Sequence, residues 1–504
     1  MLTGAKYIES LDDGRLTYFE GHQVPDLLAE PAFATPVRAI AAGYDRHYSP
    51  EPGATNPLVV APRSIEELRQ RAEVVHTIDL ALAVTYGSLM TLLTAAPRMS
   101  GTDPIYKERI EGYVHDAARR DIRIAECITD AKGDRTLPPA QQDDPDAYVR
   151  VVERRSDGVV IRGAKLHISA ASLVHELMVM PTKSMKPGEE EYSIACAVPV
   201  KSPGVYVINT TFHPRSDDVR HFPVSSEHSM PDGFVVFDDV FVPDERVFLD
   251  GETPNAAVFA HALGLWERLG GVTAMVNQAD QLVGLAQLIA EANGLARVPH
   301  IRDKIDEMLI HATLLRAGLE AALANAHVTP EGYYYPDELY TNVAKYQGAS
   351  QFHLMVRHLH DIAGGAVLTS PTLGDLENPD TGKYTGAASY NLMVRHLHDI
   401  AGGSIVTAPS IADFDNPETG SLVRKYMGTR SDVDGEYRTR LFHTIRDLTA
   451  DSFGGWHLVT NLQSGGGLFA QRIVSRKYYD MQRAKNLGLA AAGLAEADSG
   501  PTTS

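Results

Sequence analysis

The sequence predicts a mostly helical α+β protein in which a β-region separates two helical regions. Residues 1–145 carry mainly helical patterns, residues 146–253 carry short alternating apolar runs bounded by turn residues, and residues 254–504 return to helical spacing. Apolar residues make up 44% of the 504 residues, which is enough to build large cores. We therefore predict an N-terminal helical domain, a middle β-barrel or sandwich, and a C-terminal helical bundle over these three ranges.

The N-terminal region contains a clear helix start at Ser64. The Ser64 hydroxyl can accept a hydrogen bond from the first helical turn, and Glu67 three residues later completes a capping box. A polar loop that contains prolines runs from Asp130 to Asp146. The helical character is expected to end in this loop.

The middle region opens with the signature of a hairpin. Residues 148–152 alternate like a strand, residues 155–158 are typical of a turn, and residues 159–161 return as a second strand. Further short strands are expected at residues 177–180, 192–198, 204–208 and 234–237. Strands spaced in this way are typical of a barrel or a sandwich.

The C-terminal region is expected to bury one apolar face of a helix. Residues at helical spacing that we assign to this face are Ile301, Ile305, Met308, Leu309, Ala312, Leu315 and Leu319. We read these residues as core. The tail from residue 490 to 504 is small and polar, and is expected to fray.

A tandem repeat lies in the same region. Residues 345–382 recur as residues 383–420, and two copies are too few for a solenoid. A duplication with one copy in the core is therefore expected, the alternative being two equivalent sites. His358 and His360, like His396 and His398 in the second copy, resemble metal ligands, but positions i and i+2 point to different sides of a helix, so we predict no metal site.

Charge and targeting signals narrow the classes of function. The net charge of -19 argues against a nucleic-acid partner. The N-terminus lacks a signal-peptide pattern, and no uninterrupted apolar run is long enough to cross a bilayer. We expect a cytoplasmic protein with no membrane partner, in which Cys127 and Cys196 are reduced.

Several segments, in order along nearly the whole chain, together carry a family resemblance. They are residues 129–135 (TDAKGDR), 144–149 (DPDAYV), 163–167 (GAKLH), 175–181 (HELMVMP), 237–248 (FDDVFVPDERVF), 299–305 (PHIRDKI) and 399–403 (DIAGG). This set resembles the family that contains the large oxygenase component of 4-hydroxyphenylacetate 3-hydroxylase and 4-hydroxybutyryl-CoA dehydratase, and it is closer overall to the dehydratase branch. The resemblance implies an acyl-CoA dehydrogenase-like fold, FAD between barrel and bundle, and a homotetramer.

Contacts to FAD are predicted at three places. A flavin diphosphate needs cationic and backbone N–H partners, which a turn formed by Lys132, Gly133, Asp134 and Arg135 can supply; the alternative is a solvated turn. Hydroxyl groups that could bond the isoalloxazine edge belong to Ser169 and Ser172. A backbone that can approach a ligand closely is formed by Ser464, Gly465, Gly466 and Gly467, the alternative being a flexible linker.

The chain departs from the dehydratase at the iron-binding positions. The resemblance places one histidine and one cysteine ligand where this chain has Leu265 and Val272, and two more cysteines near residues 99–103, which contain none. A glutamate that the dehydratase has near its C-terminus is Asn461 here. Apolar side chains cannot replace thiolates, so we expect no iron–sulfur cluster.

The chain also departs from the phenol hydroxylases, which the resemblance describes as binding substrate with an Arg, a Tyr and a His. Tyr106 matches the Tyr, Thr102 stands for the Arg, and Glu126 stands for the His. We predict Tyr106 and Glu126 as catalytic residues. A carboxylate at this place repels a phenolate but accepts a bond from an amine or another donor; the alternative for Glu126 is a solvated or salt-bridged residue.

Together these residues predict an FADH2-dependent monooxygenase of the two-component type that acts on a small, aromatic organic substrate. A separate flavin reductase is expected to supply FADH2, because no Gly-x-Gly-x-x-Gly nicotinamide motif lies at a strand–helix junction. Two alternatives remain: a cluster-less, dehydratase-like flavoprotein that acts on an acyl-CoA, and a catalytically degenerate binding subunit.

Overall fold

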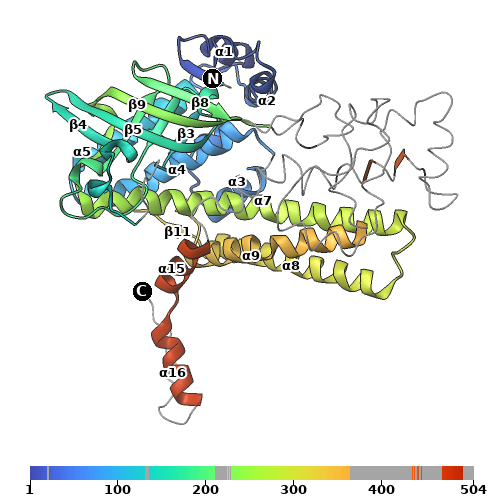
Figure 1. Cartoon of the computed structure of the whole chain (residues 1–504). Helices are drawn as coiled ribbons and strands as arrows, with labels where there is room; N and C mark the ends of the chain where they lie inside the picture. Colours follow the sequence, from blue (N-terminus) through green and yellow to red (C-terminus); the bar gives the residue numbers. More distant parts are fainter. Residues whose placement is uncertain are drawn as a thin grey trace.

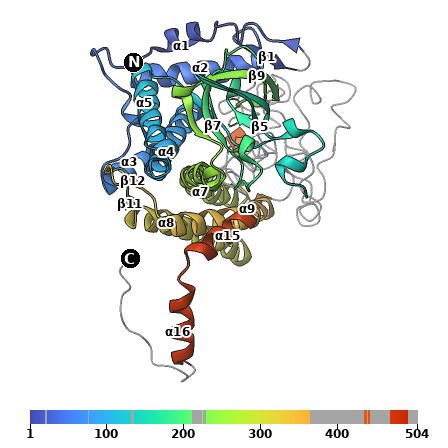
Figure 2. The ribbon, with the colours of Figure 1, turned by 90° about the vertical axis from the view of Figure 1, so that its left-hand side faces the viewer.

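The computed structural model describes residues 1–19, 22–75, 77–130, 136–210, 229–363 and 468–491, with residues 224, 226, 434, 436, 437, 440, 441 and 444. Within these residues a long helix, α7 (Ala256–Ala292), separates two layers (Figure 1). The β-sheets lie on one side of α7, and the helices α8 (Pro299–Ala324) and α9 (Glu338–Ala363) lie on the other (Figure 2).

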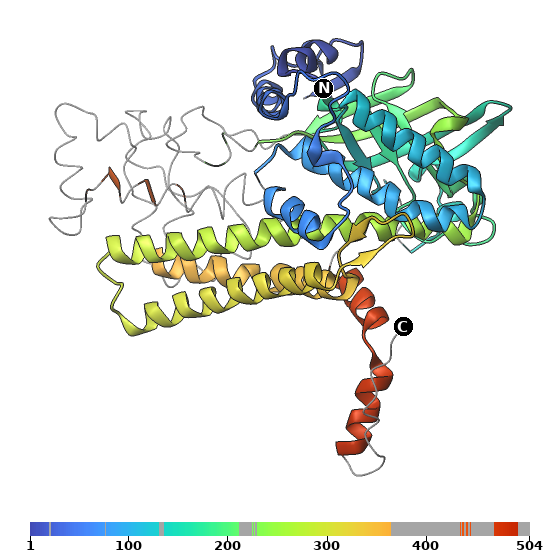
Figure 3. The ribbon, with the colours of Figure 1, turned by 180° about the vertical axis from the view of Figure 1, so that it is seen from behind.

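The N-terminal helices pack beside the sheets (Figure 3). They are α1 (Gly4–Ser10), α2 (Pro31–His47), the 3-10 helix η1 (Pro57–Val59), α3 (Ile65–Val74), α4 (Leu80–Ser100) and α5 (Pro104–Arg120). The start predicted at Ser64 is confirmed, because the Glu67 N–H donates to Ser64 Oγ at 3.1 Å. The Glu67 carboxylate in turn accepts from the Arg63 N–H at 2.9 Å, which completes the capping arrangement one residue earlier than expected.

Helix α4 corrects one expectation from the sequence. By length and composition it could cross a membrane, so an apolar run of that length does exist. However, 72% of the apolar segment of α4 is buried inside the protein. This is the pattern of a helix that is apolar because protein surrounds it.

The strands form two sheets. The first has the order β2 (His22–Gln23), β1 (Leu16–Phe19), β8 (Val205–Thr210), β9 (Asp232–Pro243), β5 (Gly158–Ser169), β4 (Arg150–Arg155). The second has the order β10 (Val247–Asp250), β7 (Ile194–Pro199), β6 (Glu176–Val179), β3 (Ile124–Cys127). The predicted hairpin is confirmed as β4 and β5, which pair antiparallel with Arg155 opposite Gly158.

Two features of the sheets differ from the sequence-based expectation. Strands β1, β2 and β3 come from residues before 145, where mainly helices and no particular strand were expected, and β1 pairs parallel with β8. In the described residues, no ladder joins the two sheets into one closed barrel. Short 3-10 turns connect the strands: Pro139–Gln141, Pro145–Ala147, Ala171–Leu173, Glu190–Tyr192, Asp244–Arg246 and Thr253–Asn255.

The long helices form the remaining layer. The short hairpin of β11 (His327–Val328) and β12 (Tyr334–Tyr335) connects α8 to α9. Helix α15 (Leu468–Tyr478) lies against α9, and α16 (Met481–Ala491) projects away from the body (Figure 1). The mostly helical α+β fold class is confirmed. The second repeat copy, residues 383–420, lies outside the described residues.

The apolar face predicted for α8 needs one correction. Ile301, Ile305 and Met308 are buried as expected, and so are Ala312 and Leu315. Leu309 is 51% exposed instead. It directly follows Met308, and a step of one residue turns an α-helix by about 100°, so both side chains cannot face the same core.

Candidate functional site

The site is built first from the contact between α4 and β3. The Ile124 N–H donates to Thr85 Oγ1 at 2.8 Å, which fixes the start of β3 against α4. Two residues further along β3, the side chain of Glu126 reaches Ser88 of α4, whose hydroxyl donates to Glu126 Oε1 at 3.3 Å. A carboxyl group therefore faces α4 where this helix packs against β3.

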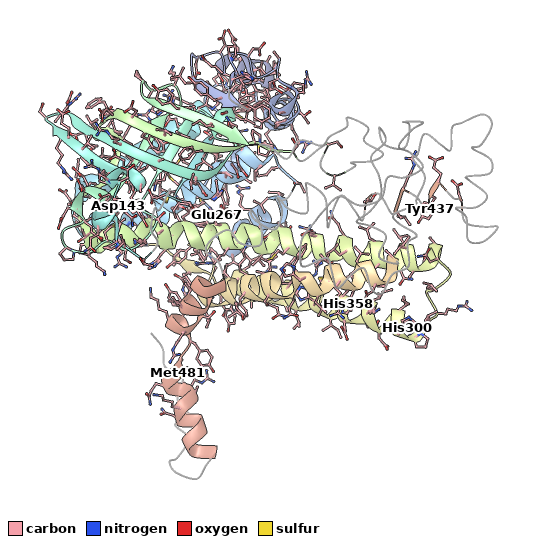
Figure 4. The ribbon with its side chains drawn as sticks, in the orientation of Figure 1. Asp143, Glu267, His300, His358, Tyr437 and Met481 are labelled. Atoms are coloured by element: carbon pink, nitrogen blue, oxygen red, sulfur yellow. The ribbon has the colours of Figure 1, made fainter. Side chains whose placement is uncertain are left out.

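Helix α7 brings a second carboxyl group to the same place. The Trp266 indole stacks edge-on against Tyr86, with ring centroids 5.7 Å apart, and its Nε1–H donates to Thr94 Oγ1 at 2.9 Å. These contacts hold the next residue, Glu267, beside α4, on the part of α7 below the sheets (Figure 4). Glu126 and Glu267 are hydrogen-bonded to one another through their side chains.

Gly87 of α4 provides the space that this carboxyl pair occupies. A Cβ atom at residue 87 would lie 3.1 Å from Glu126 Oε1 and 3.5 Å from Glu267 Oε1. Both carboxyl groups therefore converge over the one position in this stretch of α4 that has no side chain. Any larger residue would press on the pair.

Lys345 of α9 completes the cluster. Its side chain is fully buried, and burial lowers its pKa to about 7, although the negative charge of Glu267 acts in the opposite direction. Burial raises the pKa of Glu126 and of Glu267, and the charge of Glu267 raises that of Glu126 further. The pKa values of Glu126, Glu267 and Lys345 are therefore all shifted within this one cluster.

Two hydrogen-bonded carboxyl groups in an apolar setting share a proton, because ionising both would place like charges side by side. A pair that carries one proton can donate one hydrogen bond and accept another. Because its pKa is raised, the pair can also hold a proton at a pH at which an unperturbed carboxyl group is already ionised. Chemically, the cluster of Glu126, Glu267 and Lys345 is suited to acid–base work.

We expect Gly87→Ala to lower turnover about tenfold, because the new methyl group displaces carboxyl groups that must be held accurately. The protein should remain folded, since alanine favours the helix. Gly284→Ala in α7 is the matched control, because nothing lies within 4 Å of its added Cβ. Steady-state rates of both variants test this, and equal rates would contradict the role given to Gly87.

Tyr106, the other predicted catalytic residue, lies elsewhere. Its hydroxyl donates to Glu252 Oε1 at 2.9 Å, just before α7 begins, and burial raises the pKa of the phenol. Glu126 instead contacts Glu267, eleven residues along α7 from Ala256. This span corresponds to roughly 16 Å of helix. The structure therefore gives the two predicted residues separate partners.

The two predicted flavin-contacting serines also differ from one another. Ser172 is fully buried and is engaged with Asn209 and Thr17, so its hydroxyl serves the junction of β1 and β8. Ser169 is partly buried and donates to Asp232 at 2.5 Å. Only Ser169 lies at a partly accessible edge, where β5 pairs with the start of β9.

The remaining predicted cofactor residues, Lys132 to Arg135 and Ser464 to Gly467, lie outside the described residues. The chain is described up to Asp130, just before the first of these segments. Asp130 pairs with the buried Lys165 at 2.8 Å and accepts from the Val149 N–H at 3.0 Å. The backbone that leads into the predicted diphosphate turn is thus anchored to β5.

The positions that resemble iron ligands are apolar and buried. Leu265 and Val272 of α7 are 4% and 1% exposed. Cys127 of β3 and Cys196 of β7 are buried opposite Val179 of the strand between them, and burial raises the pKa of both thiols. Both cysteines therefore belong to the core of the four-stranded sheet.

Sequence reasoning missed Glu267 and Lys345. Glu267 stands with Arg268 inside an apolar run of α7, where a charged residue is costly unless it has a partner or a task. The charge of Glu267 within this apolar run could therefore have marked it as a candidate site residue. For Lys345 the sequence offers no comparable signal, because its burial results from α9 packing against α7.

A partly buried cluster of titratable groups from β3, α7 and α9, in this fold, is typical of an enzyme. The chain belongs to the 4-hydroxyphenylacetate 3-hydroxylase family. Residues 3–249 match the family's N-terminal domain, and residues 255–389 and 384–493 match its C-terminal domain in two segments. The family is flavin-dependent, and the predicted family resemblance is thereby confirmed.

Relatives of both branches are similar to this chain. The 4-hydroxybutyryl-CoA dehydratase/vinylacetyl-CoA-Delta-isomerase of Clostridium aminobutyricum is 28% identical over 409 residues, which are 75% of this chain and 82% of the relative. The 4-hydroxyphenylacetate 3-monooxygenase oxygenase component of Geobacillus sp. is 26% identical over 483 residues, which are 90% of this chain and 88% of the relative.

Solved structures of both branches share the fold. The 4-hydroxybutyryl-CoA dehydratase of N. maritimus has a TM-score of 0.80 and 24% identity, covering 100% of this chain and 97% of its own. The oxygenase component of 4-hydroxyphenylacetate 3-monooxygenase, complexed with FAD, has a TM-score of 0.78 and 22% identity, covering 98% and 99%. The fold is therefore common to the oxygenases and the dehydratase.

Proposed function

We propose that this protein is an FADH2-dependent monooxygenase of the two-component type that hydroxylates a small aromatic substrate. The proposal depends mainly on α7, where apolar residues stand at the positions that the resemblance assigns to iron ligands. Leu265 and Val272 are buried apolar residues where the resemblance places cluster ligands, while Glu267 faces Glu126. The whole chain has two cysteines, fewer than the three that such a cluster requires.

The residues near the start of β9 fit a flavin. The Ser229 hydroxyl is buried without a hydrogen-bond partner among the described residues. It lies two residues before Pro231, whose carbonyl accepts from the Ala170 N–H at 2.9 Å, next to Ser169. Ser169 and Ser229 would hold polar atoms of the ring system. Bound reduced flavin would supply the electrons that activate oxygen.

In this proposal the chain's own residues bind the substrate and move its proton. The carboxyl pair of Glu126 and Glu267 would accept a hydrogen bond from the substrate's hydroxyl or amino group and take up its proton. Lys345, whose pKa is lowered to about 7 by burial, would balance the negative charge that the pair carries before it takes up the proton. Packing of Tyr86 and Trp266 around the pair would exclude water.

We also propose, from the oxygenase components among its relatives, that a separate reductase supplies the reduced flavin. A cytoplasmic homotetramer remains our proposal for its location and assembly. The exposed apolar residues Leu309, Ile310 and Leu314 of α8 support association with further copies. Light scattering on the purified protein tests the assembly.

The reaction is tested with protein that carries photoreduced FAD under anaerobic conditions. We expect hydroxylated product by mass spectrometry only after oxygen is added, with 4-hydroxyphenylacetate, 4-nitrophenol and a matching aniline as substrates. The 28% identity to the dehydratase supports a second candidate, a cluster-less flavoprotein acting on an acyl-CoA. Oxygen-independent conversion of 4-hydroxybutyryl-CoA would replace the first proposal with the second. Failure to bind either form of FAD would favour a binding subunit without activity.

A further inference from the structure

Three helices bring basic side chains together, and among the described residues these side chains have no acidic partners within salt-bridge distance. Arg98 lies near the end of α4, His261 and Arg268 lie on α7, and Lys477 lies near the end of α15. In the described part of the chain, none of the four forms a salt bridge. A group of cations without an ion pair to any described residue is unexpected in a chain whose net charge is -19.

The packing of α4 on α7 places Arg98 beside His261. Thr94 of α4 bonds Trp266 of α7 at 2.9 Å, and Thr102, just beyond α4, bonds Asn255 at 2.6 Å. The two helices therefore run antiparallel. Arg98 is midway between Thr94 and Thr102 on α4. It therefore lies at the level of His261, which is about midway between Asn255 and Trp266 on the neighbouring chain segment.

On α7 itself, Arg268 turns back toward His261. Residues 261, 264 and 268 share one face of the helix, and Gly264 leaves that face open. The Arg268 Nη2 and Nη1 atoms lie 3.2 and 3.3 Å from the place that a Cβ of Gly264 would take. The Arg268 Nε atom is buried and has no hydrogen-bond partner in the part of the chain that the structure describes.

Helix α15 adds the fourth cation. A hydrogen bond between Ser475 and Asn342 fixes α15 on α9. Burial lowers the pKa of His261, and the positive charges of Lys477, Arg268 and Arg98 lower it further. Burial raises the pKa of Glu338 of α9, and the charge of Lys477 partly opposes that rise.

We propose that Arg98, His261, Arg268 and Lys477 form a binding site for phosphate groups of a cofactor or substrate. Guanidinium groups bind phosphate oxygens through paired N–H donors, and a partly buried arginine with a vacant N–H does so strongly. A flavin dinucleotide and a coenzyme A thioester both carry a diphosphate. The assignment rests on the basic residues alone and holds whichever reaction the enzyme catalyses.

The test is a calorimetric titration with inorganic pyrophosphate at constant ionic strength. We expect saturable binding to the wild-type protein, and affinity at least tenfold weaker in Arg268→Gln, since a hydrogen bond between charged groups is lost. Lys477→Gln, at an exposed position, should also weaken binding and does not put the fold at risk. Arg302→Gln on α8 removes one exposed positive charge elsewhere and should bind like the wild type.

Competition then identifies the source of the phosphate. Displacement of pyrophosphate by FAD assigns the site to the cofactor, and displacement by coenzyme A assigns it to an acyl-CoA substrate. Displacement by neither overturns the assignment to a cofactor or substrate. Absence of saturable binding, or unchanged affinity in both Arg268→Gln and Lys477→Gln, overturns the site itself.

Discussion

Replacing Glu267 by glutamine is expected to lower turnover about a hundredfold while flavin binding is retained. The amide cannot take up a proton, so the pair with Glu126 loses its acid–base capacity, and such capacity contributes at least this factor. Glutamine keeps the size and the hydrogen-bonding reach of the side chain. The loss should therefore appear in kcat.

The pH dependence of this variant has a defined sign. The charge of Glu267 raises the pKa of Glu126, so its removal should lower that pKa and shift the acidic limb of the rate profile to lower pH. The same charge raises the pKa of Lys345, which should fall below about 7. Glu291→Gln at the exposed end of α7 is the control and should leave the profile unchanged. If the rate of Glu267→Gln depended on pH in the same way as that of the wild type, the two carboxyl groups would not interact.

Replacing Glu176 by glutamine should destabilise the folded protein by about 3–5 kcal/mol, because two arginines lose their buried carboxylate partner. Glu176 of β6 accepts from Arg246 at 2.7 Å, from Arg120 at 2.5 Å and from Tyr113 at 2.9 Å. Its side chain is 3% exposed. The loss is measured as a lower urea midpoint at pH 7.

The effect of Glu176 should depend on pH with a definite sign. Burial alone would raise its pKa, but the hydrogen bonds and charges of Arg246 and Arg120 lower it below its ordinary value of 4.5. The stabilisation is therefore complete above pH 4.5 and is lost as the pH falls through the lower folded-state pKa. The midpoints of wild type and Glu176→Gln should converge in that acidic range. Asp280→Asn breaks the exposed pair with Arg316 and should cost less than 1 kcal/mol.

Local patterns predicted the local structure well. The cap at Ser64 and the turn between Arg155 and Gly158 depend on neighbouring residues, so the sequence alone indicates them. Strands β1 and β3 were missed because each has four residues, and their pairing with β8 and β6 comes from distant segments. Pairing of this kind leaves little trace in the spacing of apolar residues.

For the candidate site, the sequence indicated one member and the structure added the others. Glu126 was predicted from its place in the family pattern, whereas Glu267 and Lys345 were not. Ser172 was predicted as a flavin contact, but its hydroxyl is engaged with Asn209 and Thr17 inside the protein. A serine's partners depend on which strands meet around it, and spacing along the chain does not contain that information.

The sequence by itself determined the family, the fold class, the hairpin that became β4 and β5, and the presence of only two cysteines. Tertiary structure alone decided that carboxyl groups from β3 and α7 share the space over Gly87, beside a buried lysine from α9. The physical reason is that proton affinity depends on distance and on exclusion of water, which exist only once these separate segments are packed together.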